Sequence, residues 1–153
     1  MNTSTIRKLL KTYKCFKGVF ASDMLPYSAN LPLNIIVNTD PSYKPGQHWV
    51  AISIDAKGHG YYFDSFGFPP LVKNIFKFIS EKAFNGWSYN RRQLQNVMSS
   101  TCGNYCVLFI IFKCNNLSNK EFFFNFGRDT AKNDTNMLKI FKNFSFVKKF
   151  ASE

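Results

Sequence analysis

The segment from Cys102 to Cys114, CGNYCVLFIIFKC, constrains the fold more than any other part of this sequence. Apolar residues recur along it without the polar face that a surface helix carries, so the pattern favours a helix that is buried on nearly all sides. Its β-branched residues leave a buried strand as the alternative. In either case the rest of the chain has to cover this segment, which predicts a globular fold built around it.

The flanking patterns predict strands before this segment and helices on both sides of those strands. Alternating and β-branched residues indicate strands at 33–37, 48–55 and 60–65, and a tight turn joins the last two in a hairpin. Residues 18–26 are expected to form a loop, and residues 93–98 a further short strand. Apolar residues at helical spacing predict helices at 5–14, 71–82, 122–126 and 137–150. This order indicates an α+β fold in a single domain spanning residues 1–153.

The composition is typical of a globular protein in an intracellular, reducing compartment. Hydrophobic residues make up 45% of the chain, and 18 of its 153 residues are Phe, which is enough for a packed core. No apolar run reaches the roughly 18 residues of a membrane span, and the N-terminal segment lacks the pattern of a secretory signal. The cysteines Cys15, Cys102, Cys106 and Cys114 are accordingly predicted to be free thiols. Their spacing does not match a zinc site, so no metal is expected.

The chain is strongly basic, with 20 Lys and Arg residues, 9 Asp and Glu residues and a formal net charge of +11. Such a surface attracts polyanions, and nucleic acid is the natural candidate. The charge is equally consistent with a role in solubility alone, and the sequence contains no nucleic-acid-binding motif. Non-specific contact with DNA is therefore expected as a physical effect and not as the main function. Whether DNA activates the protein stays open.

Three polar residues occupy positions that suit catalysis. His48 begins a predicted strand, and an imidazole titrates near neutral pH, as a general base requires. Asp64 ends the partner strand sixteen residues later, where we expect it to approach the Nδ1 side of His48. Cys102 begins the apolar helix, and the positive end of a helix dipole favours the thiolate. Taken singly, each has an ordinary interpretation, as a structural histidine, a turn aspartate or a small core residue.

The order of these residues, together with a glutamine, resembles a known family. The stretches that carry the resemblance are GQHWVAISID around His48, YYFDSFGFPP around Asp64, and QLQNVMSSTCGNYC, in which Gln95 precedes Cys102 by seven residues. This pattern of His-Trp, an acidic residue at a strand end, Gln and Cys-Gly is similar to the adenovirus-protease (adenain) type of cysteine peptidase. That type lies within the wider group of SUMO and ubiquitin-like proteases. The resemblance extends over residues 15–114, where the segments GVF and IIVNTD also resemble viral and mobile-element members.

The resemblance implies a papain-like cysteine protease fold, with a mixed central β-sheet packed by helices and the nucleophile at the N-terminus of the buried central helix. It implies a catalytic triad of His48, Asp64 and Cys102, with Gln95 as an oxyanion donor and no required cofactor. The implied activity is that of a cysteine endopeptidase, a thiol hydrolase that cleaves viral or mobile-element capsid or core precursors at Gly-containing sites during virion maturation. We expect a monomer that acts on protein substrates, in the virion and the host nucleus if the chain is viral.

Two neighbours of the triad each have a role in this expectation. Trp49 either covers the site and limits the access of water or packs in the core of the hairpin, and the sequence does not separate the two. Gly103 is expected to let a substrate backbone approach the nucleophile closely.

Departures from the family pattern keep other functions open. The acidic residue is Asp64, as in the SUMO-protease branch, whereas the adenovirus enzymes use Glu, so a protease specific for SUMO or ubiquitin-like proteins is the main alternative. Cys15 lies far from the region where adenovirus-type enzymes attach an activating peptide, so covalent peptide activation is not expected. Some bacterial acetyltransferases share the triad order, but nothing in this chain resembles their cofactor-binding insertion. A DNA-coating protein without activity is the last alternative, and the presence of all four catalytic residue types argues against it.

Overall fold

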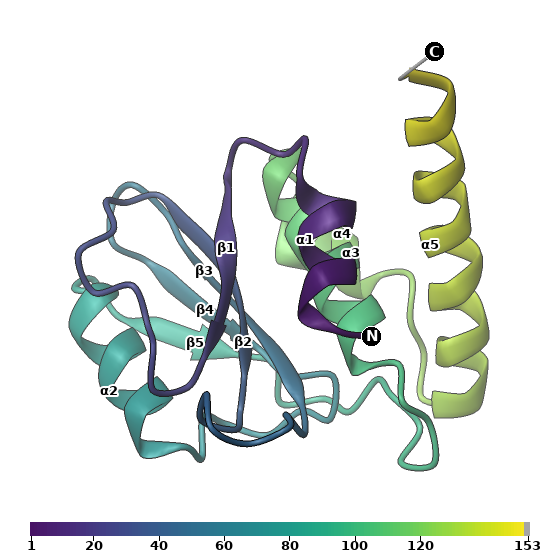
Figure 1. Cartoon of the computed structure of the whole chain (residues 1–153). Helices are drawn as coiled ribbons and strands as arrows, with labels where there is room; N and C mark the ends of the chain where they lie inside the picture. Colours follow the sequence, from purple (N-terminus) through teal and green to yellow (C-terminus); the bar gives the residue numbers. More distant parts are fainter. Residues whose placement is uncertain (152–153) are drawn as a thin grey trace.

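The computed structural model describes residues 1–151 and the side chains of residues 1–144. Within that part of the chain, helices pack on both faces of a five-stranded sheet (Figure 1). The elements, in chain order, are α1 Thr3–Leu10, β1 Phe16–Ala21, β2 Leu33–Asn38, β3 Trp49–Ile54, β4 Gly60–Phe63, α2 Lys73–Lys82, β5 Trp87–Tyr89, α3 Cys102–Cys114, α4 Asn119–Phe123 and α5 Thr130–Ala151. The predicted α+β class is therefore confirmed.

The sheet is mixed and follows the order of the strands in the sequence. Strand β2 pairs antiparallel with β3, and β3 pairs antiparallel with β4, whereas the outer strands β1 and β5 run parallel to their neighbours β2 and β4. A parallel pair needs a crossover connection. Helix α2 provides it between β4 and β5 (Figure 1).

Each face of the sheet has its own apolar core. On one face, side chains of β2, β3 and β4 pack against α2, which contributes Ile75, Phe78 and Ile79. The opposite face packs against α3, which is covered in turn by α1, α4 and α5 (Figure 1). Phe63 of β4 stacks on Phe109 of α3, with ring centroids 4.7 Å apart.

Helix α3 is the centre of the larger core, as its composition predicts. Every residue from Tyr105 to Phe112 is buried, because the sheet lies on one side of the helix and the other helices cover the rest. The predicted buried helix at 102–114 is confirmed with the same bounds. Its first residue is Cys102, so the fold fixes this side chain at the edge of the core next to the sheet.

Two of the local predictions are wrong. Residues 18–26 were expected to form a loop, but Gly18 to Ala21 belong to β1, an edge strand whose pairing with β2 is interrupted at Gly18, where φ is +138°. Residues 93–98 were expected to form a strand, but they are a loop, and the strand lies earlier, at β5. Both strands depend on a parallel partner that is distant in sequence, so local alternation does not reveal them.

The prediction of four free thiols is also wrong. Cys15, between α1 and β1, forms a disulfide with Cys114, the last residue of α3, across a sequence separation of 99. Their Cα atoms lie 5.7 Å apart, within the range that a disulfide requires. Cys102 and Cys106 are the free thiols. The described part of the chain contains no helix long and apolar enough to cross a membrane.

Candidate active site

His48 and Asp64 meet at the open end of the β3–β4 hairpin. His48 immediately precedes β3, and Asp64 immediately follows β4. The imidazole Nε2 lies 2.8 Å from Asp64 Oδ1, and the same oxygen accepts a hydrogen bond from the backbone N–H of Phe66 at 2.8 Å. The Phe66 ring stacks on the imidazole, with centroids 5.1 Å apart and planes inclined by 26°. The carboxylate and the aromatic ring together fix the orientation of His48.

The predicted pair is therefore brought together, but through the other ring nitrogen. Asp64 binds Nε2, not Nδ1, which leaves Nδ1 for the nucleophile. The reason is the hairpin register, in which Ala51 pairs with Phe63 and Ile54 with Gly60. Continued past the strand ends, this register sets His48 opposite Phe66 and puts the carboxylate of Asp64 beside the far edge of the ring.

Cys102 occupies the first position of α3 and is hydrogen-bonded to His48. Its sulfur also accepts from the backbone N–H groups of Trp49 and Gly103. Helix α3 and the sheet are packed against one another by the core, so the nucleophile and the base are held by rigid elements. The structure thus brings His48, Asp64 and Cys102 together from two strand ends and one helix start.

The electrostatics of the three side chains favour a thiolate–imidazolium pair. Burial lowers the pKa of His48, but hydrogen bonds to Asp64 and Cys102 and their negative charges outweigh it and raise the pKa to about 9. Burial raises the pKa of Cys102, but the hydrogen bond and charge of His48 and the two backbone donors bring it below its usual value. By contrast, complete burial raises the pKa of Cys106 well above the usual value, which leaves Cys106 an unreactive thiol in the core.

Gln95 lies in the loop that leads to Cys102, and it is buried. Its side-chain Oε1 accepts a hydrogen bond of 2.6 Å from the Ser65 hydroxyl, and its Nε2 donates to the Ser99 carbonyl at 2.9 Å. The Ser99 carbonyl thereby fixes which end of the amide is the donor, because a carbonyl oxygen can only accept. Ser65 directly follows Asp64, so two consecutive residues orient the base and the amide.

Several of these supporting residues were not identified from the sequence. The side chain of Asn90 is buried and binds the backbone of Asp64 on both sides, accepting from its N–H at 3.0 Å and donating to its carbonyl. Ser65 is fully buried. The one available signal was the pair Asp64-Ser65 in the family-like stretch YYFDSFGFPP.

The predicted role of Gly103 has to be corrected. Gly103 is buried, and a Cβ atom on it would lie 3.0 Å from Met1 Cβ and 3.2 Å from Trp49 Cδ1. It therefore permits close packing of the protein's own N-terminus and not of a substrate. Trp49 is 9% exposed, belongs to the core, and donates its indole N–H to the Met1 carbonyl at 2.9 Å, which favours the packing interpretation.

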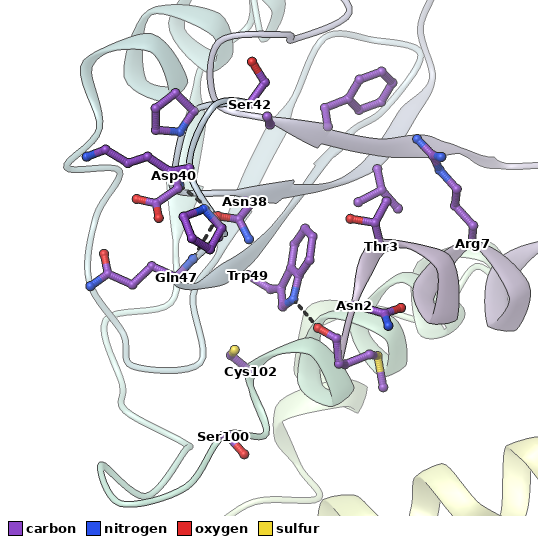
Figure 2. A pocket seen from close by; sticks show the side chains of 18 residues that line it. Asn2, Thr3, Arg7, Asn38, Asp40, Ser42, Gln47, Trp49, Ser100 and Cys102 are labelled. Atoms are coloured by element: carbon purple, nitrogen blue, oxygen red, sulfur yellow. Dashed lines mark hydrogen bonds between the residues drawn. The ribbon is translucent and has the colours of Figure 1, made fainter.

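A cleft of about 470 Å³ opens beside Cys102 (Figure 2). The N-terminal residues and Arg7 form one wall, and β1 with the loop that precedes His48 forms the other. In Figure 2, Trp49 lies in the middle of the lining residues, and Cys102 lies below it with Ser100. The cleft therefore brings open space to the nucleophile, since Cys102 is one of its lining residues. Among the described residues, no group of three or more His, Cys, Asp or Glu side chains could hold a metal ion.

The chain is similar to known proteins in sequence and in fold. No family model matches the chain. It is 27% identical over 135 residues to the protease of Bovine adenovirus 7, a match that covers 77% of this chain and 67% of that protein. The predicted resemblance to adenovirus-type proteases is confirmed, and it supports a peptidase.

Solved structures give the fold. ChlaDub1 from Chlamydia trachomatis matches with a TM-score of 0.54 and 15% identity, over 73% of this chain and 60% of that one. An ASFV protease matches with a TM-score of 0.48 and 23% identity, over 69% of this chain and 42% of that one. The chain thus spans less than two thirds of either solved structure. The likeness to ChlaDub1 confirms the predicted fold.

Proposed function

We propose that the chain is a cysteine endopeptidase in which Cys102 is the nucleophile, His48 the acid–base group and Asp64 the residue that orients it. The observation that carries the proposal is the position of the His48 ring, hydrogen-bonded to Asp64 at 2.8 Å through Nε2 and to Cys102 through its other side. A surface histidine–aspartate pair is common, but one that also holds a thiol at a helix N-terminus beside a cleft combines the parts that acyl transfer requires.

In this mechanism the Cys102 thiolate attacks the scissile carbonyl carbon, and a tetrahedral intermediate forms. The imidazolium of His48 gives its Nδ1 proton to the leaving amine as the peptide bond breaks, which leaves a thioester on Cys102. His48 then takes a proton from water, whose oxygen attacks the thioester and releases the acid and the thiol. Asp64 keeps the other proton on Nε2 and stabilises the imidazolium.

The developing oxyanion is bound by Gln95 and by the backbone N–H of Cys102 in this proposal. Gln95 Nε2 carries two hydrogens and donates one to the Ser99 carbonyl, and in this proposal the other binds the oxyanion of the substrate. Loss of one donor of this kind typically costs about 100-fold or more in turnover.

The proposed substrates are capsid or core precursor proteins of a virus or mobile element, cleaved at Gly-containing sites. The similarity to the Bovine adenovirus 7 protease supports this class. A protease for SUMO or another ubiquitin-like protein is the alternative, and the use of Asp64 in place of Glu favours it. We further propose that DNA binds the basic chain, whose net charge is +11, and raises its activity in the virion or the host nucleus.

The experiment is cleavage of a panel of fluorogenic peptides ending in Gly-Gly or Gly-X-Gly, with a SUMO conjugate as a separate arm. Wild type is compared with Cys102→Ala and with the matched control Cys106→Ala, which removes a buried thiol of the same helix. We expect cleavage that disappears in Cys102→Ala and persists in Cys106→Ala. A rate that rises with DNA and falls back as salt is added would support DNA activation. Cleavage that survives Cys102→Ala would refute the assignment of the nucleophile.

A further inference from the structure

The loop that carries Gln95 is held in place by residues far away in the sequence. The backbone N–H groups of Leu94 and Gln95 both donate to the Ser65 carbonyl, at 2.8 and 3.0 Å. The Gln95 carbonyl accepts from the Gln93 side chain at 2.9 Å. These bonds fix Gln95 relative to the sheet. The loop is also joined directly to α3, on which the nucleophile sits, by a long hydrogen bond of 3.5 Å from the Tyr105 hydroxyl to the Leu94 carbonyl.

The start of helix α5 adds a second connection between this loop and α3. Asn133 is buried and donates its side-chain N–H to the Leu94 carbonyl at 3.2 Å and to the Gly127 carbonyl at 2.9 Å. The next residue, Asp134, accepts from the backbone N–H of Asn96 at 3.3 and 3.4 Å. Two consecutive residues of α5 therefore bind the residues on both sides of Gln95.

Asp134 also binds the helix that carries Cys102. Its Oδ1 accepts a hydrogen bond of 2.8 Å from the Tyr105 hydroxyl, one turn after Cys102 in α3, and a longer one of 3.4 Å from Thr101, the residue before Cys102. One carboxylate thus bridges the loop of the amide donor and the helix of the nucleophile. It is 9% exposed, and among the described residues no Lys, Arg or His forms an ion pair with it.

A buried carboxylate compensated only by neutral donors is a costly way to join two elements, because an apolar contact would hold them without the loss of hydration. What hydrogen bonds add to packing is a fixed distance and direction between the groups that they join. An oxyanion site requires this, since its donors have to lie about 2.7–3.1 Å from the position of the developing charge.

We infer that Asp134, supported by Asn133, is a positioning residue that holds the Gln95 amide in register with Cys102 for binding of the oxyanion. The inference rests on the proposed function and adds the C-terminal helix to its site. Asp134 itself does not contact the substrate. Its removal is expected to lower the rate of acyl transfer and to leave the reactivity of the Cys102 thiolate unchanged.

The test uses Asp134→Asn, which keeps the shape of the side chain and removes its charge. The matched control is Asp129→Asn, because Asp129 is exposed, precedes the same helix and has a carboxylate that accepts from the Lys132 N–H at 3.0 Å. A second variant, Tyr105→Phe, keeps the ring in the core and removes the hydroxyl that joins α3 to Asp134 at 2.8 Å and, more weakly, to the Leu94 carbonyl at 3.5 Å. Thermal unfolding of each protein verifies that it is folded.

Each protein is assayed in two ways, by cleavage of the best fluorogenic peptide of the panel and by alkylation of Cys102 with iodoacetamide. Alkylation needs the thiolate but develops no oxyanion. We expect kcat for the peptide to fall about 10-fold or more in Asp134→Asn and to fall also in Tyr105→Phe. The rate of alkylation should stay within about 2-fold of wild type in both variants. Asp129→Asn should match wild type in both assays.

A purely structural role would give a different result, in which both rates fall together with the folded fraction. That result, or peptide cleavage by Asp134→Asn and Tyr105→Phe equal to that of Asp129→Asn, would overturn the inference and leave the proposed function intact. If wild type cleaves no peptide of the panel although Cys102 is alkylated, the proposed function fails, and the inference fails with it.

Discussion

Replacing Asp64 with Asn tests whether the carboxylate sustains the thiolate–imidazolium pair. An Asn side chain can still accept from His48 Nε2 and from the Phe66 N–H, the two hydrogen bonds that Asp64 Oδ1 receives. The substitution therefore preserves the geometry and removes the negative charge. Any change in the ionisation of His48 and Cys102 then reports the charge alone.

The magnitude follows from the pKa of His48. Raising this pKa from 6.5 to about 9 corresponds to roughly 3 kcal/mol in favour of the imidazolium, at about 1.4 kcal/mol for each pH unit. Asp64 makes the largest contribution that raises the pKa, and an opposite charge at this distance typically accounts for about 1 to 3 pH units. We expect the pKa of His48 to fall by that amount in Asp64→Asn, which weakens the pair by roughly 1–4 kcal/mol.

The sign of each pH effect is then defined. In wild type the imidazolium is lost as the pH rises through about 9, so peptide cleavage should fall on that alkaline side. In Asp64→Asn this loss occurs at lower pH. The Cys102 thiol loses its cationic partner and ionises at higher pH, so alkylation by iodoacetamide at pH 7 should slow.

Alkylation as a function of pH is the assay, because Cys106 is fully buried and Cys15 and Cys114 are paired, which leaves Cys102 as the reactive thiol. Asp55→Asn is the matched control, since Asp55 binds His59 at 3.3 Å in an exposed pair and carries the same charge. If the alkylation profile of Asp64→Asn coincides with those of wild type and Asp55→Asn, Asp64 does not stabilise the pair and the reasoning is refuted.

Two further predictions concern stability. Phe122→Ala should lower the free energy of unfolding by about 3–5 kcal/mol in urea titrations. The reason is that its buried ring contacts those of Phe63, Phe109, Phe112, Phe123 and Phe126. The control Phe124→Ala, at a side chain that is 89% exposed, should change the free energy of unfolding by no more than about 0.5 kcal/mol. Equal effects of the two variants would contradict the packing argument. The double variant Cys15→Ser with Cys114→Ser should lower the free energy of unfolding by about 2–5 kcal/mol, because the disulfide closes a long loop. It should leave the alkylation of Cys102 unchanged, because Cys102 lies at the opposite end of α3, about 18 Å away. Altered alkylation in the folded variant would show that the disulfide shapes the site.

The chain order of the candidate site was predictable because its parts lie in segments with strong local patterns. His48 and Asp64 bound a hairpin that alternation reveals, and Cys102 begins a helix whose apolar residues leave no polar face. The ring nitrogen that faces Asp64 was predicted wrongly, because it depends on the register of the hairpin and on the orientation of the ring. A register is set by paired hydrogen bonds and side-chain packing, and the turn sequence alone defines it only loosely.

The contacts missed from the sequence are those between residues with no local signature. Cys15 looked like a free thiol until the fold placed it beside Cys114, 99 residues away. Asp134 lies outside the predicted helices at 122–126 and 137–150, but in the structure it belongs to α5 and is buried between Asn96 and Tyr105. Gly103 read as a substrate contact and instead packs against Met1.

The sequence by itself determined the α+β class, the central helix and the identity of the residues at its N-terminus and at the ends of the hairpin. These features follow from periodicity and from the chemistry of a few side chains, both of which are local. Only the tertiary structure decided which nitrogen of His48 faces Cys102, which hydroxyl binds the Gln95 amide and which carboxylate joins the amide loop to the helix. Such distances of a few ångströms arise when elements far apart in the chain pack into one core, and no segment carries that information alone.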